Sequence, residues 1–335
     1  MDGPLPCFSE LGTTAFSTSS KPAMSRLALG TNLFGTDGGP GWTLDRRAAY
    51  SVFERFFRLG GRTFDTADVY HSGQAETWLG EFLHGAAVRR NELTISSKGG
   101  WKRTHNRSLM ESVHRSIDGS LARMKLEYFD VYWLHRWDGH SGKAEIYDAV
   151  SSVLASGKAL SVGLSNFPVR LVAQLVGSIP EAPVRLQQVQ YSLIAREPER
   201  EVIPHARETG TRVWACAVLA NGMLARGAAE HATAVSGRIA SKAVTDPRLT
   251  RMSGRNARIV SETERIAKAL GLKSAQVALA WILTREVDVA VFGASRPQQV
   301  DELMEAMKQG LPANAVAALD AASALPPEVP YLYFN

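Results

Sequence analysis

Cysteine is scarce in this chain of 335 residues, and the scarcity excludes two kinds of architecture. The two cysteines, Cys7 and Cys216, lie far apart in the sequence. Such a pair offers neither a disulfide framework nor the C-x-x-C spacing of a metal site. We therefore expect an intracellular protein, and the sequence gives no sign of a metal ion.

Long hydrophobic runs are also absent. No stretch approaches the roughly 18 uninterrupted apolar residues of a membrane span. The first ten residues, MDGPLPCFSE, contain two acids and two prolines where a secretory signal would have basic residues followed by an apolar run. We therefore expect a cytoplasmic protein without a membrane partner.

The chain lacks runs of like charge and low-complexity tracts. Its formal net charge is +5, and lysine and arginine form no basic cluster interleaved with aromatic residues. This argues against nucleic acid as the main partner, while a mildly basic surface favours a phosphorylated small molecule. With 45% hydrophobic and 21% charged residues, the chain can bury the core of one large globular domain.

What the sequence does contain is a regular alternation of β-rich segments and helical patterns. Helical spacing of apolar residues recurs between the strands, for example in 74–85 and 108–124. The predicted strands are 26–32, 62–67, 92–98, 128–135, 159–166, 184–193, 211–219 and 287–295. Eight strands separated by helices predict an α/β protein, a single-domain (β/α)8 TIM barrel. We place the barrel at residues 25–325, after an N-terminal extension (1–24) and before a C-terminal tail (326–335).

A doubly wound parallel sheet is the alternative fold. Such a sheet normally carries G-x-G-x-x-G after its first strand. Here the first strand is followed by GTNLFGTDGGPG, which lacks that spacing. The barrel is therefore favoured.

Polar residues stand at the ends of four successive predicted strands. Asp65 ends the second strand, Lys98 the third, His135 the fourth, and Ser165 with Asn166 the fifth. Each alone has an ordinary interpretation, such as a helix cap or a structural histidine. Active-site groups of a barrel lie at these strand ends, and core packing does not require the coincidence. We therefore predict a functional site there.

Several motifs occur in a fixed order that resembles the aldo-keto reductase superfamily. They are FDTADVYHSGQAE, SSKGG, SLARMKLEYFDVYWLHRWD, VGLSNF, QVQYSL, LANGML and GASRPQQV, and they span about residues 25–305. The resemblance implies a (β/α)8 barrel that binds NADP(H). It also implies a catalytic tetrad of Asp65, Tyr70, Lys98 and His135.

The resemblance carries cofactor contacts onto this sequence as well. Those to the nicotinamide carboxamide fall on Ser165, Asn166 and Gln188. Those to the pyrophosphate fall on Leu219, Ala220 and Gly222, with a further contact expected from Arg226. Those to the adenosine 2′-phosphate and adenine fall on Ser295, Arg296 and Gln299, and an arginine there favours NADPH over NADH. The remaining cofactor positions are Gly30, Thr31, Asn32, Asp65, Cys216, Ala217 and Gly293.

Two positions depart from the pattern of the superfamily. Cys216 stands where an aromatic ring commonly stacks on the nicotinamide, and Trp214, two residues earlier on the same strand face, is expected to take over part of that role. Leu303 stands where an asparagine that contacts adenine is common. Both departures bear on cofactor binding and leave the tetrad intact.

The tetrad is suited to reducing a carbonyl group. Tyr70 would donate the proton, Lys98 would ease that transfer, and Asp65 would hold the lysine charged. His135 would orient the carbonyl oxygen by a hydrogen bond.

The substrate is expected to be a small carbonyl compound. The predicted substrate residues are Phe34, Tyr70, Trp101, His135 and Trp137, which together form a partly aromatic pocket. Aldehydes, ketones, keto-sugars and polyketide intermediates all remain open. The alternative function is that of an NADP(H)-binding regulatory subunit with weak catalysis, as in the potassium-channel β subunits, and the change at Cys216 motivates it.

Overall fold

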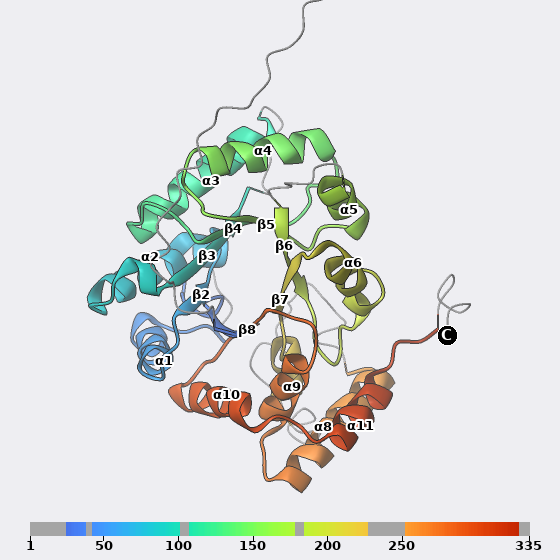
Figure 1. Ribbon diagram of the computed structural model, residues 1–335. Helices are drawn as coiled ribbons and strands as arrows, with labels where there is room; N and C mark the ends of the chain where they lie inside the picture. Colours follow the sequence, from blue (N-terminus) through green and yellow to red (C-terminus); the bar gives the residue numbers. More distant parts are fainter. Residues whose placement is uncertain (1–24, 38–41, 101–106, 178–183, 227–251, 328–335) are drawn as a thin grey trace, which may run out of the picture.

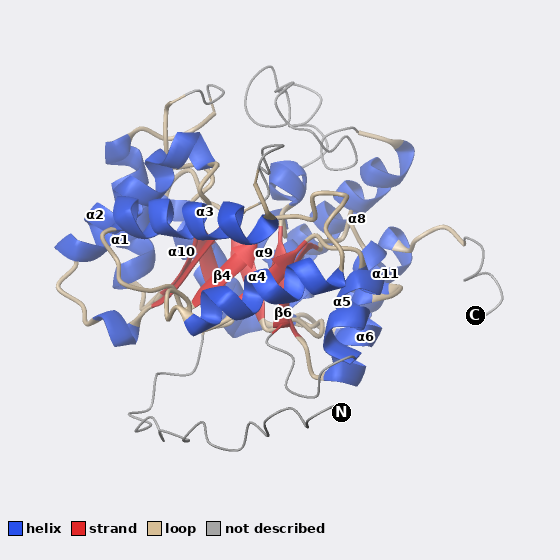
Figure 2. Ribbon diagram, turned by 90° about the horizontal axis from the view of Figure 1, so that it is seen from above, coloured by secondary structure: helices blue, strands red, loops and turns tan. Residues whose placement is uncertain are grey.

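Parallel strands of the chain close into a barrel. The computed structural model describes residues 25–37, 42–100, 107–177, 184–226 and 252–327. Each strand pairs in parallel with the next one in the chain, and β8 pairs with β1. Figure 1 shows the helices surrounding the strands, and Figure 2 shows from another side that the strands lie inside the layer of helices. The predicted (β/α)8 barrel is confirmed.

The strands of the barrel are short. They are β1 (Leu27–Gly30), β2 (Thr63–Asp65), β3 (Thr94–Gly99), β4 (Val131–Leu134), β5 (Val162–Ser165), β6 (Val184–Gln190), β7 (Arg212–Cys216) and β8 (Val289–Phe292). The segment predicted as strand 211–219 is shorter in the structure. The chain leaves the sheet after Cys216 because Ala217 adopts a left-handed conformation, with a φ of 52°.

The α-helices cover the outside of the barrel. They are α1 (Arg46–Arg58), α2 (Gln74–Gly85), α3 (Leu109–Met124), α4 (Lys143–Ala155), α5 (Val169–Gly177), α6 (Val202–Thr209), α8 (Gly254–Leu270), α9 (Ser274–Leu283), α10 (Pro297–Gln309) and α11 (Ala313–Ser323). Short 3-10 segments are η1 (Tyr70–Gly73), η2 (Arg90–Glu92), η3 (Glu197–Glu199) and η4 (Ala220–Ala225).

Local sequence signals explain where the helices begin. The Asp45 side chain accepts a hydrogen bond from the backbone N–H of Ala48 at the start of α1. Ser108 and Glu111 form a reciprocal capping box at the start of α3. These caps satisfy backbone donors that have no partner within the helix.

The apolar core has two parts. One lies between the strands and the helices, and the other fills the inside of the barrel. In the inner part, the rings of Trp133 and Trp214 meet edge to face, with centroids 5.2 Å apart. The buried inner residues are Ala28, Val131, Trp133, Leu186, Trp214, Val289 and Val291. The inside of the barrel is therefore packed, and it forms a floor beneath the strand ends.

Among the described residues, no single helix is long and apolar enough to cross a membrane. The pair α8 and α9 meets that test by length and composition only when taken together, across a bend of 98°.

The tight packing of the inner core predicts that one added methyl group lowers the stability of the protein. A Cβ atom at Gly163 would overlap the Trp133 ring and would lie 2.9 Å from the Leu186 side chain. Gly163→Ala is therefore expected to lower the free energy of unfolding by about 1–3 kcal/mol, because tightly packed neighbours cannot make room. Urea unfolding followed by circular dichroism measures the change.

Gly85→Ala serves as the control, because a Cβ there meets no atom within 4 Å. It should leave stability unchanged or raise it slightly, since alanine favours the helix. Equal behaviour of the two variants would contradict the packing described for Trp133.

Candidate active site

The site is built on the carboxyl ends of β2, β3 and β4. Asp65 is the last residue of β2, Lys98 stands one residue before the end of β3, and His135 follows β4. The backbone N–H of His135 donates to the carbonyl oxygen of Gly99, which continues the ladder past β4. Parallel strands end at one mouth of the barrel, so these three side chains come together there.

Lys98 and Asp65 form a buried ion pair. Their side chains are 2% and 3% exposed, and Lys98 Nζ donates to Asp65 Oδ2. Lys98 Nζ also donates to the carbonyl oxygen of Thr66 at 2.9 Å. Burial by itself would lower the lysine pKa, but Asp65 and Tyr70 raise it more, and the net pKa is raised. Lys98 is therefore charged at neutral pH.

Asp65 receives three side-chain donors, two from β3 and one from β6. Its Oδ1 atom accepts from Ser96 Oγ at 2.6 Å and from Gln188 Nε2 at 3.1 Å, in addition to the lysine on Oδ2. These donors occupy both oxygens of the buried carboxylate and fix its orientation. The contact with Gln188 was not predicted from the sequence, because 123 residues separate it from Asp65.

Tyr70 lies beside the ion pair on the turn after β2. Its ring centroid is 5.3 Å from Lys98 Nζ. Burial raises the pKa of the Tyr70 hydroxyl, and the lysine lowers it by a smaller amount, so the net pKa is raised. The expected lowering of the Tyr70 pKa by Lys98 is present, but the effect of burial on that pKa is larger. Tyr70 keeps its proton at neutral pH.

The turn that carries Tyr70 is strained. His71 and Ser72 adopt left-handed backbone conformations, with φ angles of 50° and 55°, and Gly73 follows at 90°. For residues other than glycine this conformation costs about 1–2 kcal/mol each. Surrounding contacts must therefore hold the turn in place.

His135 faces Tyr70 edge to face, with ring centroids 6.2 Å apart and an interplanar angle of 86°. Burial, Lys98 and Arg136 lower the pKa of the imidazole to about 3. The ring is therefore neutral at physiological pH and can donate a hydrogen bond without giving up a proton. Its Nδ1 atom is buried and has no hydrogen-bond partner, an arrangement that favours a bound polar group.

Three side chains predicted to meet the nicotinamide lie close together at the ends of β5 and β6. Ser165 and Gln188 are partners in the ladder, and the backbone N–H of Asn166 donates to the Gln188 carbonyl oxygen at 2.9 Å. Asn166 Nδ2 donates to Ser165 Oγ at 3.1 Å. The structure thus joins this group to Asp65 through the Gln188 amide.

The residues predicted beside the cofactor on β1 and β8 also gather at the mouth. Thr31 is buried, and its backbone N–H donates to the Asp65 carbonyl oxygen at 2.9 Å. A Cβ at Gly30 would meet Val291 at 3.0 Å, and one at Gly293 would lie 3.4 Å from Asn32 Oδ1. The absent side chain at Gly30 leaves room for Val291 of the inner core.

Cys216 lies at the end of β7, and burial raises the pKa of its thiol to about 12. Trp214, two residues earlier, is fully buried in the floor of the barrel and packs against Trp133. The expectation that Trp214 replaces the missing aromatic ring is therefore wrong, because its ring presents no open face to a ligand. Leu303 is 2% exposed and belongs to the outer core, so it too offers no contact to a ligand.

The loop after β7 contains the residues predicted for the pyrophosphate. Leu219 precedes η4, in which Ala220, Asn221 and Gly222 all have positive φ angles, and Arg226 follows its end. The backbone N–H groups of Ala220 and Gly222 donate to the carbonyl oxygens of Ala217 at 2.7 Å and Leu219 at 2.9 Å, so the turn closes on itself.

The start of α10 has the features of a phosphate site. Arg296 is exposed at the N-cap position, its side chain does not cap the helix, and Pro297 is the first helical residue. Gln299 Oε1 accepts from the Ser295 backbone N–H at 2.7 Å and from Ser295 Oγ at 3.1 Å. A helix N-terminus beside a guanidinium group attracts negative charge.

The residues predicted to contact the substrate lie in different surroundings. Phe34 is fully buried and meets Phe82 of α2 edge to face at 6.3 Å. Its assignment to the substrate pocket is therefore wrong, because it packs in the core. Trp137 is partly buried, and its Nε1 atom donates to the Ser141 carbonyl oxygen at 2.9 Å. Trp101 lies outside the described residues.

These residues fit a nicotinamide dinucleotide. Gln190 ends β6 beside Cys216 in the ladder, and its Oε1 atom is buried without a partner, as is His135 Nδ1. Unpaired polar atoms at the mouth suit the polar nicotinamide head, while the start of α10 suits a phosphate. In the part of the chain that the structure describes, no group of three or more acidic, histidine or cysteine side chains could hold a metal ion.

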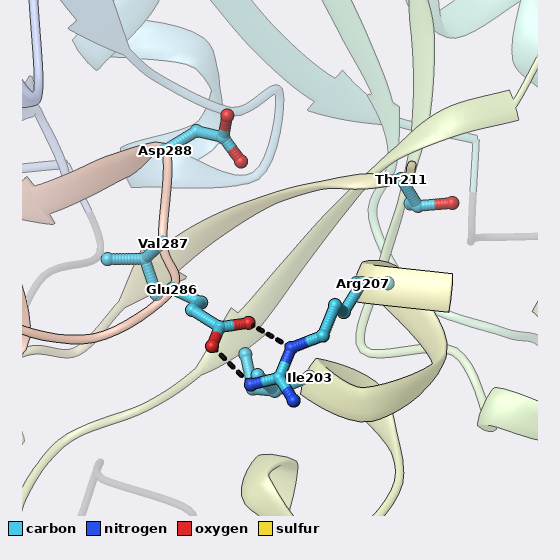
Figure 3. A pocket seen from close by; sticks show the side chains of 7 residues that line it. Ile203, Arg207, Thr211, Glu286, Val287 and Asp288 are labelled. Atoms are coloured by element: carbon cyan, nitrogen blue, oxygen red, sulfur yellow. Dashed lines mark hydrogen bonds and ion pairs between the residues drawn. The ribbon is translucent and has the colours of Figure 1, made fainter. Parts of the chain in front are cut away.

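A separate cavity lies at the opposite end of the barrel. Figure 3 shows that Arg207 of α6 and Glu286 before β8 meet across it through two hydrogen bonds. Thr211 and Asp288, which precede β7 and β8, also line it. Because its charged groups already pair with each other and lie away from the mouth, this cavity plays no part in the site.

Several known proteins are similar to this chain in sequence. An aryl-alcohol dehydrogenase of Pestalotiopsis microspora is 27% identical over 317 residues, which cover 90% of this chain and 79% of the relative. The versiconal hemiacetal acetate reductase of Aspergillus parasiticus is 26% identical, with 89% of this chain and 93% of the relative covered. The NADP(+) aryl-alcohol dehydrogenase of Phanerodontia chrysosporium is 24% identical, with 88% and 80% covered.

The sequence model of the Aldo/keto reductase family matches residues 26–324. That match includes every strand of the barrel and the whole cluster around Lys98. The chain therefore belongs to the aldo/keto reductase family, whose members are oxidoreductases that use a nicotinamide cofactor.

Proposed function

We propose that the protein reduces a small carbonyl compound, an aldehyde, ketone or keto-sugar, to the alcohol with NADPH. The observation that carries the proposal is that Tyr70 and the neutral His135 lie beside the buried pair of Lys98 and Asp65 at one mouth. The names of the relatives, which are reductases and dehydrogenases, support it.

Each member of the cluster has a distinct role in this proposal. When bound, the reduced nicotinamide supplies the hydride. His135 donates a hydrogen bond that orients the carbonyl oxygen, and its neutral state keeps it from acting as the acid. Tyr70 gives its proton to the oxygen as negative charge develops there. Lys98 stabilises the resulting phenolate, and Asp65 keeps the lysine charged and in place.

Preference for NADP(H) is also part of the proposal. The exposed Arg296 at the start of α10 provides a cation where the adenosine 2′-phosphate would lie. One relative is named for NADP(+). Ser165, Asn166 and Gln188 would hold the carboxamide at the other end of the cofactor.

The regulatory alternative still has one observation in its favour. Cys216 stands at the position expected beneath the nicotinamide, and the nearby Trp214 ring is buried, so β7 offers no aromatic platform for stacking there. A regulatory subunit would bind NADPH tightly and turn over very slowly with every carbonyl offered. Brisk turnover with any aryl aldehyde would exclude it.

The role of Tyr70 predicts the effect of removing its hydroxyl. Tyr70→Phe should lower kcat for aldehyde reduction by about 10²–10⁴-fold, because the acid is lost. The Kd for NADPH, measured by fluorescence quenching, should stay within about twofold, since the change spares the groups proposed to hold the cofactor. The rate of NADPH oxidation with a panel of aryl aldehydes and diketones gives kcat.

Tyr50→Phe is the matched control, because Tyr50 is 43% exposed on α1. It should leave kcat unchanged. Full activity of the Tyr70→Phe variant would refute the proposed proton donor.

The pKa directions predict a simple dependence of reduction on pH. The pKa of His135 is lowered to about 3 and that of Tyr70 is raised above its ordinary value of 10. Neither group changes charge between about pH 6 and about pH 9, so kcat should be nearly constant there. A fall in kcat below an apparent pKa near 6.5, absent from a His135→Asn variant, would show that the imidazole titrates during turnover and contradict its neutral role.

The phosphate contact predicts a change in cofactor preference. Arg296→Met should raise the Kd for NADPH by about tenfold or more, because a charge-assisted hydrogen bond is lost, and should leave the Kd for NADH nearly unchanged. Calorimetric titration of both cofactors measures the ratio. Arg58→Met, at an exposed arginine that pairs with Glu54, is the control and should alter neither value. An equal loss for both cofactors would place Arg296 away from the 2′-phosphate.

A further inference from the structure

The turn that carries Tyr70 is held from outside the barrel. The side chains of β3 alternate, so that Lys98 points to the mouth while Ser97 and Gly99 face α2 and α3. Figure 1 shows these two helices next to each other outside β3. The strained turn Tyr70–Gly73 lies directly before α2.

A buried ion pair lies on this outer side. Glu76 of α2 is fully buried, and its Oε1 accepts from Ser97 Oγ at 2.5 Å. Arg123 of α3 donates through Nε to Glu76 Oε2 at 2.6 Å, and through a terminal nitrogen to Ser120 Oγ at 3.2 Å. The pair thus ties α2, α3 and β3 together.

Arg123 also touches the strained turn itself. A Cβ atom at Gly73 would lie 2.6 Å from Arg123 Cδ, so the arginine stem packs directly against this glycine. Gly73 has a φ of 90°, and its carbonyl oxygen accepts from Thr77 Oγ1 at 3.2 Å. The end of the turn is therefore fixed by the arginine on one side and by α2 on the other.

The beginning of the turn is held by α3, the helix that also carries Arg123. Ser116 Oγ donates to Asp68 Oδ2 at 2.6 Å, and the Asp68 backbone N–H donates to the Lys98 carbonyl oxygen at 2.9 Å. Tyr132 of β4 donates its hydroxyl to Ser116 Oγ at 2.9 Å. Ser116 and Arg123 are seven residues apart on α3, so they lie on one face and bracket the segment from Asp68 to Gly73.

We propose that Arg123, together with Glu76, is a positioning residue for Tyr70. Neither side chain is part of the cluster at the mouth. Arg123 acts by filling the space against Gly73 and fixing the left-handed turn, which sets the place of the Tyr70 hydroxyl beside Lys98. The proposal rests on the proposed function, in which Tyr70 is the proton donor.

The test compares Arg123→Met with a matched variant at another buried ion pair. Arg90 forms an ion pair with Asp130 at 2.8 Å, and their side chains are 24% and 5% exposed, against 32% and 0% for Arg123 and Glu76. Arg90 lies before β3, at the opposite end of the strand from Lys98. Arg90→Met should therefore lower stability without changing kcat of the folded protein.

Arg123→Met is expected to lower kcat by about tenfold or more, because a small displacement of a reacting group has a large effect on rate. The Kd for NADPH should stay within about twofold, and the solvent deuterium isotope effect on kcat should rise, since proton transfer becomes slower. Arg123→Lys should recover part of kcat. The rates are taken at a temperature where circular dichroism shows each variant fully folded.

A double variant isolates the connection to Tyr70. If Arg123 acts through that residue, Arg123→Met should have no further effect on the residual rate of Tyr70→Phe. If Arg123→Met is poorly folded, the double variant Glu76→Gln with Arg123→Met removes both charges and leaves no isolated buried carboxylate. It should show the same loss of kcat.

The outcomes separate the two proposals. Equal kcat for Arg123→Met and Arg90→Met overturns the positioning role and leaves the proposed function intact. The same holds if Arg123→Met lowers the residual rate of Tyr70→Phe by the same factor as it lowers the rate of the unchanged protein. Normal kcat of Tyr70→Phe alone overturns the proposed function, and the positioning role with it.

Discussion

The ion pair between Lys98 and Asp65 organises the whole mouth of the barrel. Two opposite charges are buried there, and such a pair is stable only when the remaining hydrogen-bonding capacity is satisfied. Ser96, Gln188 and the Thr66 carbonyl oxygen provide this, so that β2, β3 and β6 all contribute to one charge pair. The neutral state of His135 follows partly from the same lysine, whose charge disfavours a second cation beside it.

Strand β3 performs two tasks because its side chains alternate. On the inner face, Ser96 and Lys98 complete the ion pair at the mouth. On the outer face, Ser97 binds the buried Glu76, and the missing side chain of Gly99 leaves room for Ser116 and Tyr132. A shift of register by one residue would exchange the two faces and destroy both arrangements. The parallel ladder with β2 and β4 prevents such a shift.

The sequence predicts the barrel and the place of the charged cluster well, for a physical reason. Apolar periodicity marks the strands, and all parallel strands of a barrel end at one mouth, so Asp65, Lys98 and His135 could be placed together without knowing any distance. The direction in which an apolar ring packs is not encoded in this periodicity. Phe34 and Trp214 were accordingly expected near the ligand, whereas both are buried.

Contacts between distant segments were also beyond the reach of sequence patterns. Glu76 and Arg123 are 47 residues apart, and charged residues on helices usually face solvent. Only the packing of α2 against α3 shows that this carboxylate is fully enclosed. The end of β7 could not be predicted either. Ala217 adopts a left-handed conformation, which is typical of glycine and is not expected of an alanine.

The floor of the barrel has a consequence for the supply of protons. Trp133, Trp214 and their apolar neighbours fill the interior beneath Lys98, and they form no polar path toward the opposite end. In the proposed function, the proton that Tyr70 gives up is therefore replaced from the mouth, because the described inner residues offer no polar route beneath Lys98. Renewal of that proton and entry of the proposed ligands would then share one side of the barrel.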